Sequence, residues 1–316
     1  MSIERSLSDS VRCGCTRRQF VRTALTGAGA LVAGTEPLAA AQRNRSRTPA
    51  RGGATEIVTL GRTGIKATRL AQGTGWNGGA RSSAHTRLGE KAFTELIRHS
   101  LDQGIAFIDT ADLYGAHPYV RTAIAGVPRD KYILQSKIWP RTEYWCSPSG
   151  GAKAEVDRFR KELNAEVLEI CLIHCMTNSE WPQTFARVRD ELSEMKQQGA
   201  VRAVGVSCHD LGALKTAAAD PWVDVILARI NNAGKEAEMD GSPEEIAPVL
   251  KQARASGKVV LGMKIFGAGK LTKPEQKDAS LKYVLDNELV DAITVGMMNP
   301  QEVDDTIRRM SRVLRG

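Results

Sequence analysis

Residues 104–115 read GIAFIDTADLYG, so an apolar run passes into two carboxylates and a tyrosine within a few positions. Ile105, Phe107 and Ile108 have the composition of a buried β-strand. This strand ends on Asp109, and a carboxylate is costly to bury unless a cation meets it. We therefore expect a positively charged partner on a neighbouring strand.

The same unit, a short apolar run followed by a longer amphipathic stretch, recurs along the chain. The apolar runs are residues 69–74, 105–109, 132–137, 167–174, 202–207, 223–229, 259–264 and 291–295. Helical patterns follow most of them, at residues 91–103, 152–163, 182–198, 211–219, 243–256, 276–287 and 300–314. This alternation predicts an α/β fold. Eight units favour a closed (β/α)8 TIM barrel, with an open doubly wound sheet as the second choice.

A pair of apolar segments precedes the first unit. Residues 57–60 and 65–68 flank Gly61 and Gly64, and glycines at such a turn predict a β-hairpin. We expect this hairpin to cap the bottom of the barrel, at the N-terminal ends of the strands. The barrel core would otherwise meet water there.

The positive charge of the chain is concentrated near its N-terminus. The 316 residues carry a formal charge of +8, but residues 1–54 hold nine Arg and no Lys against three acids and account for +6. The remaining +2 comes without a basic stripe interleaved with aromatic residues. This distribution argues against nucleic-acid binding.

The N-terminal segment has the order of parts found in an export signal. Arg17 and Arg18 precede a weakly apolar run at 23–34, and small residues follow at 38–41. This order resembles a bacterial twin-arginine signal peptide. The alternative is an arginine pair before an ordinary Ala/Gly-rich helix. The apolar run is shorter than the roughly 20 residues needed to span a bilayer, so no stable membrane insertion is expected.

These features predict three parts. Residues 1–41 would be the signal peptide, residues 42–54 a disordered linker with nothing apolar to bury, and residues 55–316 the barrel. The expected location is the periplasm or the outside of the cell, with the twin-arginine export machinery as a partner.

Four cysteines follow the predicted signal, at Cys146, Cys171, Cys175 and Cys208. They lack the close pairing of zinc or iron–sulfur ligands. On one strand, Cys171 and Cys175 would lie about 13 Å apart, beyond disulfide reach. We expect free, mostly buried thiols and no metal site.

Polar side chains end four neighbouring strands of the predicted barrel. They are Asp109, Lys137 in ILQSKIW, His174 in LEICLIH and Ser207 in RAVGVS. Chemistry gathers at the C-terminal ends of barrel strands, and neighbouring strands lie about 4.8 Å apart. Lys137 can therefore supply the cation that Asp109 requires, with His174 one strand further.

Tyr114 follows Asp109 by five residues, in the loop that can fold over the strand ends. A nearby ammonium favours the phenolate and lowers the pKa of a tyrosine below its usual value of about 10. We therefore expect Lys137 to depress the pKa of Tyr114. With His174 orienting a substrate oxygen, Tyr114 would give a proton to a carbonyl as hydride reaches its carbon.

The motifs GIAFIDTADLYG, ILQSKIW, LEICLIH and RAVGVS, preceded by LGRTGIKATRLAQGTGW, resemble the aldo-keto reductase family over residues 56–314. The resemblance implies a (β/α)8 barrel, NADP or NAD as cofactor across its mouth, and reversible reduction of aldehydes or ketones. The catalytic residues of the family fall on Asp109, Tyr114, Lys137 and His174.

The resemblance also implies residues that bind cofactor and substrate. Ser207 matches the position that holds the nicotinamide carboxamide, and Asn231 keeps a later asparagine. Met263 replaces the aromatic residue that stacks on the nicotinamide. Trp76 and Trp139 match positions that wall the substrate pocket.

The cofactor half departs from the family pattern. Lys264, beside Gly267 and Gly269 whose small size permits close backbone approach, could hold the pyrophosphate. Asn299 stands where the family has an arginine for a 2′-phosphate, and Glu302 adds a negative charge. Preference for NADP over NAD is therefore in doubt.

Three functions follow from these residues. The first is a carbonyl reductase or alcohol dehydrogenase acting on a small molecule. The second is a non-catalytic barrel that binds a dinucleotide or a partner, in which Asp109 and Lys137 are only a structural pair and His174 a core histidine. The third is a lyase using Lys137 or Lys264 as a Schiff-base nucleophile.

Overall fold

The structure, a computed structural model, describes residues 52–316, so the predicted signal peptide and most of the predicted linker lie outside the described residues. Ala54, at the end of that linker, is fully buried, and its N–H donates to Ser311 Oγ at 2.9 Å. The fold therefore includes Ala54. Within residues 52–316, no helix has the length and apolar character needed to cross a membrane.

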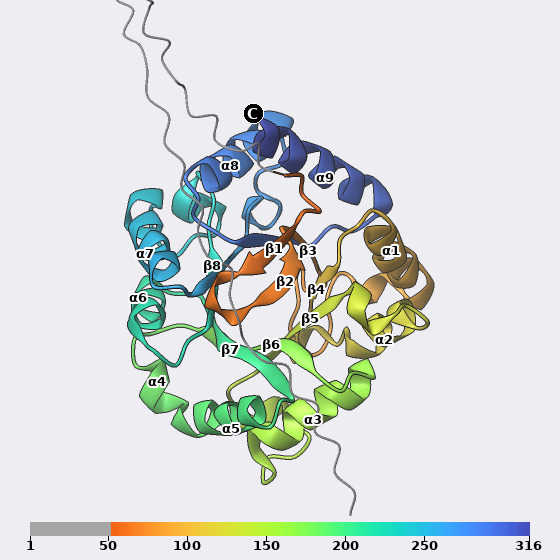
Figure 1. The fold of residues 1–316 in the computed structure, drawn as a ribbon, viewed down its shortest axis with the longest axis vertical. Helices are drawn as coiled ribbons and strands as arrows, with labels where there is room; N and C mark the ends of the chain where they lie inside the picture. The colour runs from red at the N-terminus through yellow and green to blue at the C-terminus, as the bar shows by residue number, and fades with distance from the viewer. Residues whose placement is uncertain (1–51) are drawn as a thin grey trace, which may run out of the picture. The chain divides into compact units, whose positions relative to one another are not determined.

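Eight parallel strands close into a barrel, with β10 pairing with β3 to complete the ring (Figure 1). The strands are β3 (Leu70–Gly73), β4 (Phe107–Asp109), β5 (Ile133–Ile138), β6 (Leu168–Met176), β7 (Val201–Cys208), β8 (Val225–Arg229), β9 (Val259–Met263) and β10 (Ala292–Val295). The predicted (β/α)8 barrel is confirmed, and the open sheet is excluded.

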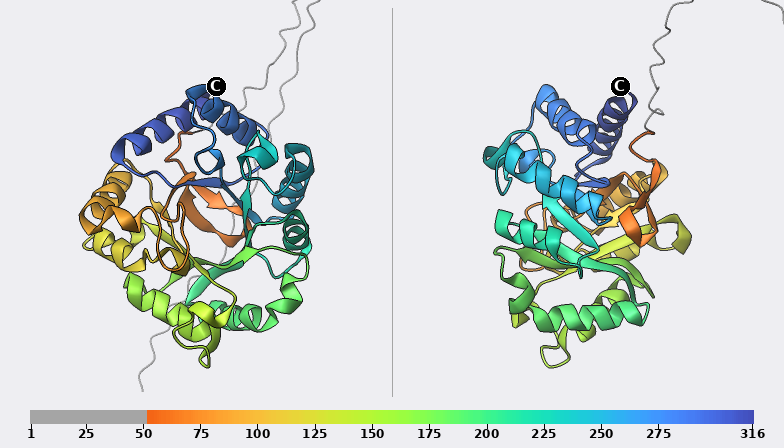
Figure 2. Two further views of the ribbon diagram at one scale, coloured as in Figure 1. Left: turned by 180° about the vertical axis from the view of Figure 1, so that it is seen from behind. Right: turned by 60° about the vertical axis from the view of Figure 1, so that its left-hand side comes forward.

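Helices surround the barrel on all sides (Figures 1 and 2). They are α1 (Glu90–Asp102), α2 (His117–Ile124), α3 (Gly151–Leu163), α4 (Trp181–Thr184), α5 (Ala186–Gln197), α6 (Leu211–Ala219), α7 (Pro243–Ala255), α8 (Pro274–Asp286) and α9 (Pro300–Arg315). Two differences from the sequence prediction stand out. The short helix α2 was not predicted, and the helix predicted at 182–198 is divided at Phe185, whose φ of −113° and ψ of 31° depart from helical values.

The predicted hairpin is present and lies across the barrel opening in Figure 1. It consists of the antiparallel strands β1 (Ile57–Leu60) and β2 (Ile65–Thr68). Leu60 and Ile65 are fully buried in one apolar cluster with Phe107 and other side chains from inside the barrel. Arg62 N–H also donates to Gly257 O at 2.8 Å, which ties the turn to the bottom of the barrel. The hairpin therefore closes the bottom of the barrel, as expected.

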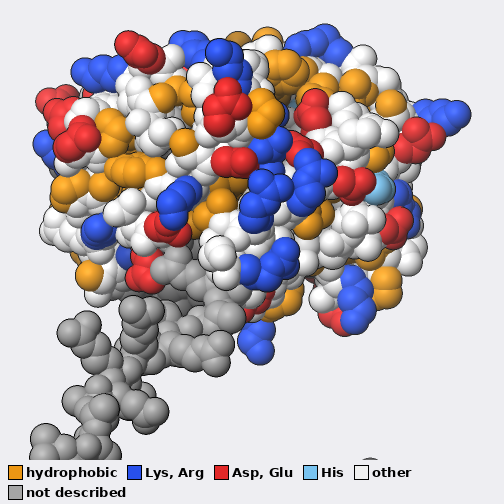
Figure 3. All heavy atoms as spheres, turned by 90° about the horizontal axis from the view of Figure 1, so that it is seen from above, with side chains coloured by type: hydrophobic (Ala, Val, Ile, Leu, Met, Phe, Trp, Pro, Cys, Tyr) orange, Lys and Arg blue, Asp and Glu red, His pale blue; other side chains and the backbone are white. Residues whose placement is uncertain are grey.

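A second and larger apolar cluster includes strand and helix residues such as Phe93, Phe159 and Trp181. Cys171 and Cys208 are buried and belong to this cluster, while Cys175 is half-buried and Cys146 exposed. All four thiols are free, as expected. On the surface, basic and acidic side chains are interleaved on the face shown in Figure 3, in keeping with the small net charge of the folded region.

Candidate active site

The C-terminal ends of the strands surround a cavity of about 710 Å³, a volume typical of small-molecule sites. The left view of Figure 2 looks at the barrel from the side opposite the hairpin. Of the site residues predicted from the sequence, nine line this cavity: Trp76, Asp109, Tyr114, Trp139, His174, Met263, Lys264, Gly269 and Glu302. Five do not: Lys137, Ser207, Asn231, Gly267 and Asn299.

The cation that Asp109 requires is Lys137. Strands β4 and β5 pair side by side, and the Lys137 ammonium donates to Asp109 Oδ1 and, at 2.9 Å, to Thr110 O. Gln135 Nε2 donates to Asp109 Oδ1 at 2.7 Å, and Thr294 Oγ1 donates to Asp109 Oδ2 at 2.9 Å. Four hydrogen bonds therefore hold this buried pair, of which the sequence predicted only the first.

Lys137 is protonated at neutral pH and lies beneath the cavity. Burial lowers the pKa of Lys137, but Asp109 and Tyr114 outweigh that effect and raise the pKa above its usual value. A Schiff-base nucleophile must be neutral and reach its substrate. The fully buried, protonated Lys137 does neither, which argues against the lyase function for this residue.

Tyr114 projects from a 3₁₀ turn, Asp112–Tyr114, that ends at Gly115. Its ring lies against the loop after β3, where a Cβ on Gly75 or Gly78 would come within 2.2 or 2.6 Å of ring atoms. The Tyr114 hydroxyl lies 3.4 Å from His174 Nε2, and Lys137 Nζ lies 5.0 Å from the ring centroid. The loop glycines thus allow the phenol to lie over the buried ion pair.

The expected depression of the Tyr114 pKa is wrong. Burial raises the pKa of Tyr114 above its usual value, and the charge and hydrogen bonding of Lys137 oppose that shift without overcoming it. The prediction considered the charge of the Lys137 ammonium but not the free-energy cost of ionising a buried phenol. At neutral pH Tyr114 is therefore protonated, which is the form that a proton donor needs.

His174 is neutral. Burial and the charge of Lys137 hold the pKa of His174 well below its usual value. Its Nδ1 is buried and has no hydrogen-bond partner within residues 52–316, while Nε2 faces the Tyr114 hydroxyl. A neutral imidazole carries one N–H donor. An oxygen atom placed beside both groups can accept hydrogen bonds from Tyr114 and His174 together.

On the predicted cofactor side, Lys264 offers a cation to a bound anion. It follows β9 with a left-handed φ of 59° and lines the cavity. Burial and the charge of Arg229 lower the pKa of Lys264. Within the described part of the chain, its ammonium makes no hydrogen bond or ion pair, so it is available to a phosphate or carboxylate.

The Asn231 side chain is hydrogen-bonded to backbone groups of the surrounding loops. Its Nδ2 donates to Ala237 O and Lys264 O, at 2.8 and 3.1 Å. Its Oδ1 accepts from the N–H groups of Ala233 and Gly234, at 2.9 and 3.1 Å. A side-chain amide has two donors and two acceptor sites, so no capacity remains. Asn231 therefore stabilises the loop in this structure, and its role at the cofactor stays a prediction.

Two further residues of the predicted cofactor site have structural contacts of their own, and their roles at a cofactor stay predictions. A Cβ on Gly267 would lie 2.8 Å from the Ala237 side chain, so this glycine permits loop packing. Asn299 caps helix α9, with its Oδ1 accepting from Glu302 N–H at 2.9 Å. Ser207 is buried, and its hydroxyl accepts from the Cys175 N–H at 2.7 Å. Its hydroxyl proton is still free to donate, and its role at the carboxamide stays a prediction.

The sequence reasoning missed several residues of the cavity wall. His209 and Cys175 line the cavity beside His174. Arg229, at the end of β8, contacts His209 Nδ1 and pairs with Asp240 at 3.3 Å. The sequence pattern could have identified them, because each of these residues lies near the C-terminal end of a strand or directly after it. Lys137 and His174 lie at equivalent places on their own strands.

The barrel and this site fit one class of protein, the NAD(P)-dependent oxidoreductases, and the comparisons with known proteins support that class. A profile of the Aldo/keto reductase family matches residues 70–281. The chain belongs to this family.

Individual relatives are distant. The Bacillus subtilis protein called aldo-keto reductase YhdN is 31% identical over 163 residues, which span 48% of this chain and 46% of that relative. A solved aldo-keto reductase structure from Pseudomonas aeruginosa has a TM-score of 0.67 at 21% identity, covering 84% of this chain and 98% of its own. A Bombyx mori aldo-keto reductase solved with NADP has a TM-score of 0.59 at 16% identity, covering 82% of this chain and 92% of its own.

Proposed function

We propose that this protein reduces an aldehyde or ketone with a nicotinamide cofactor, or oxidises the corresponding alcohol, with Tyr114 as the general acid or base. One observation carries the proposal: the protonated Tyr114 hydroxyl lies 3.4 Å from the neutral His174 imidazole at the wall of the cavity, above the buried Lys137–Asp109 pair. Family membership supports the same chemistry.

Each of these residues has a distinct part in the reaction. His174 orients the carbonyl oxygen, and Tyr114 donates its proton to that oxygen. Lys137 stabilises the phenolate that Tyr114 becomes, because its ammonium faces the ring and stays charged. Asp109 holds the Lys137 ammonium in place.

The cavity fits a nicotinamide dinucleotide. Lys264 offers an unpaired ammonium to a pyrophosphate, and Met263 and Gly269 line the same cavity. When bound, the cofactor supplies the hydride.

We infer a preference for NAD over NADP. Glu302 lines the cavity, and its carboxylate is held in place by Met298 N–H at 2.8 Å and Asn299 Nδ2 at 3.2 Å. A carboxylate can accept a hydrogen bond from a ribose 2′-hydroxyl but repels a 2′-phosphate.

The test compares Tyr114→Phe with wild type on a panel of aldehydes. Dinucleotide affinity, followed by fluorescence titration, should stay unchanged, while kcat falls about 100- to 10,000-fold because the phenol proton is lost. Tyr119→Phe is the matched control, since Tyr119 packs against Phe93 outside the cavity lining and should keep full activity. Full activity in Tyr114→Phe would refute the proposal.

We also propose that the protein is exported by the twin-arginine route. The order of Arg17 and Arg18, the apolar run and the small residues supports this. Cell fractionation should find the wild-type protein outside the cytoplasm and an Arg17→Lys, Arg18→Lys variant inside it. The same distribution for both proteins would count against export.

A further inference from the structure

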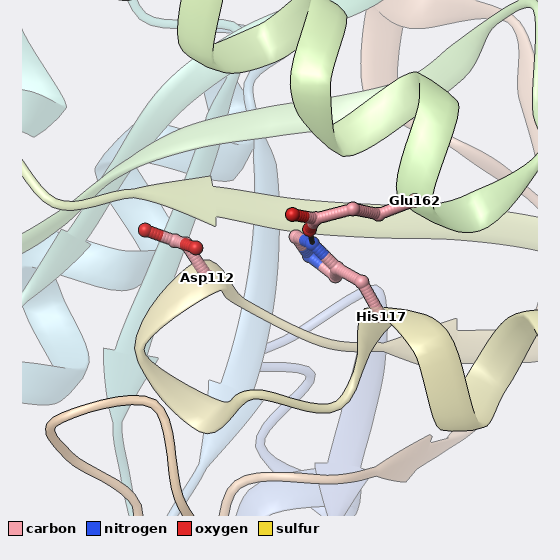
Figure 4. A group of neighbouring side chains, drawn as sticks. All are labelled: Asp112, His117 and Glu162. Carbon is pink, nitrogen blue, oxygen red and sulfur yellow. Dashed lines mark hydrogen bonds and ion pairs between the residues drawn. The ribbon is translucent and has the colours of Figure 1, made fainter. Parts of the chain in front are cut away.

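A network of buried charges lies beneath the loop that carries Tyr114. Figure 4 shows Asp112 on the 3₁₀ turn of that loop, His117 at the start of α2 and Glu162 on α3. His117 Nδ1 lies 2.8 Å from Glu162 Oε2, and His117 Nε2 lies 2.8 Å from Ser136 Oγ on β5. These bonds fix the chain three residues after Tyr114.

Arg158, on α3, is the centre of the network. Its guanidinium donates to Asp112 Oδ1 at 2.9 Å, to Glu162 Oε1 at 2.7 Å and to Glu155 Oε2 at 2.6 Å. Burial raises the pKa of the Glu162 carboxyl, but hydrogen bonds from His117 and Arg158 outweigh it and hold that pKa at about 2. Through its hydrogen bond to Asp112, Arg158 holds the chain two residues before Tyr114.

These same groups could also suggest a metal site, because ligand atoms of Asp112, His117 and Glu162 lie within 4.8 Å of one another. However, Arg158 already donates to both carboxylates, and Ser136 occupies the second nitrogen of His117. The positive charge that a metal would bring is supplied by the guanidinium, so these groups form a clamp and not a metal centre.

The network also reaches the wall of the cavity. Glu155 Oε1 accepts from the N–H of Ser147, in the loop that carries the cavity residues Trp139 and Tyr144. On the other side of Asp112, Arg81 donates to Asp112 Oδ2 at 3.3 Å and also to Tyr144 O. Arg158 and Arg81 thus join the loop of the proton donor to the loop of the pocket wall.

We propose that Asp112 and Arg158 are positioning residues that hold the Tyr114 loop and the pocket wall at residues 139–147 as one unit. This inference rests on the proposed function. Asp112 is the link between the two loops, because it accepts from Arg158 on one side and Arg81 on the other. Displacement of a reacting group by about 1 Å can cost about a hundredfold in rate.

The test is Asp112→Asn, which keeps the side-chain shape and leaves Arg158 paired with Glu155 and Glu162. We expect kcat to fall by about a hundredfold with dinucleotide affinity unchanged, and hydrogen exchange to quicken at residues 110–118 and 140–147 only. Asp157→Asn is the matched control. Asp157 pairs with Arg160 on the same helix α3, but its side chain is 48% exposed, so both readouts should stay at wild type.

A further measurement separates positioning from a general loss of stability. In a Tyr114→Phe background, Asp112→Asn should change the residual rate by less than about twofold, because no phenol proton remains to be misplaced. An equal loss in both backgrounds, a kcat near wild type, or faster exchange throughout the barrel would overturn the proposal. If the wild type shows no carbonyl turnover, the proposed function fails, while the exchange comparison of Asp112→Asn with Asp157→Asn still decides whether the clamp exists.

Discussion

The two halves of the cavity differ in whether their lysine ammonium is paired. At the ends of β4 and β5, Asp109 and Lys137 are bonded to each other and to the surrounding strands. On the opposite side, Lys264 directly follows β9, and its ammonium makes no hydrogen bond or ion pair within the described residues. The first half is built to hold one arrangement of charges. The second half keeps a charge available for a ligand that carries the opposite sign.

The largest effect should come from breaking the first half. In Lys137→Met, Asp109 stays buried without its ion-pair partner, and breaking a buried pair in this way costs about 3–5 kcal/mol of stability. Denaturant unfolding measures that loss, and kcat should fall at least about a hundredfold because the phenolate of Tyr114 loses its stabilising charge.

Lys264→Met is the matched control from the second half. Because its ammonium has no carboxylate partner in residues 52–316, stability should change little, while dinucleotide affinity weakens. Adding Asp109→Asn to Lys137→Met should recover most of the stability but none of the activity. If Lys137→Met and Lys264→Met were equally stable, the contrast between the two halves would be lost.

Gly75→Ala sharpens the comparison without changing a charge. The added Cβ would lie 2.2 Å from the Tyr114 ring, so the phenol must shift from its present position. We expect kcat to fall by about a hundredfold, measured in steady state with a saturating cofactor. Gly79→Ala, in the same loop, adds a Cβ with nothing within 4 Å and should behave as wild type. Normal turnover in Gly75→Ala would show that the position of Tyr114 is not critical.

A smaller effect is expected from Glu302→Gln in the second half. Removal of this negative charge should improve affinity for NADPH relative to NADH by about tenfold, or about 1.4 kcal/mol, as measured by parallel titrations. Asp304→Asn on the same helix is the control, because Asp304 pairs with His99 and does not line the cavity. An unchanged ratio would remove Glu302 from cofactor selection.

The sequence predicted the barrel and the pairing of Asp109 with Lys137 well, because both depend on short-range patterns. The apolar runs mark the strands, and Asp109, Lys137 and His174 each lie at or near the end of one. Helix α2 was not predicted because it has only eight residues, too few for a clear amphipathic period. The hydrogen bond from Gln135 to Asp109 was also not predicted, because the sequence of one strand does not show which side chains of the neighbouring strand reach it.

On the predicted cofactor side, the structure shows contacts that the sequence did not predict, for a different physical reason. Asn231 and Asn299 lie where a cofactor-binding residue was expected, but backbone groups of their own loops occupy their side chains. An asparagine side chain readily forms hydrogen bonds to nearby backbone groups. The sequence does not show whether its hydrogen bonds go to its own loop or to a ligand. The raised pKa of Tyr114 could not be predicted for the same reason. It results from burial of the phenol, which only the folded structure shows.

The smallest expected change is in the pH profile, and it separates the structure from the sequence-based expectation. In the proposed reaction, reduction requires protonated Tyr114 and neutral His174. Because the Tyr114 pKa is raised and the His174 pKa is lowered, kcat/KM for reduction should be flat from about pH 7 to 9 and fall only above about pH 10. Alcohol oxidation needs the phenolate, so its rate should rise over that same upper range. A fall in reduction centred near pH 7 to 8 would instead mean that Lys137 depresses the Tyr114 pKa after all, and that its charge outweighs burial in the working enzyme.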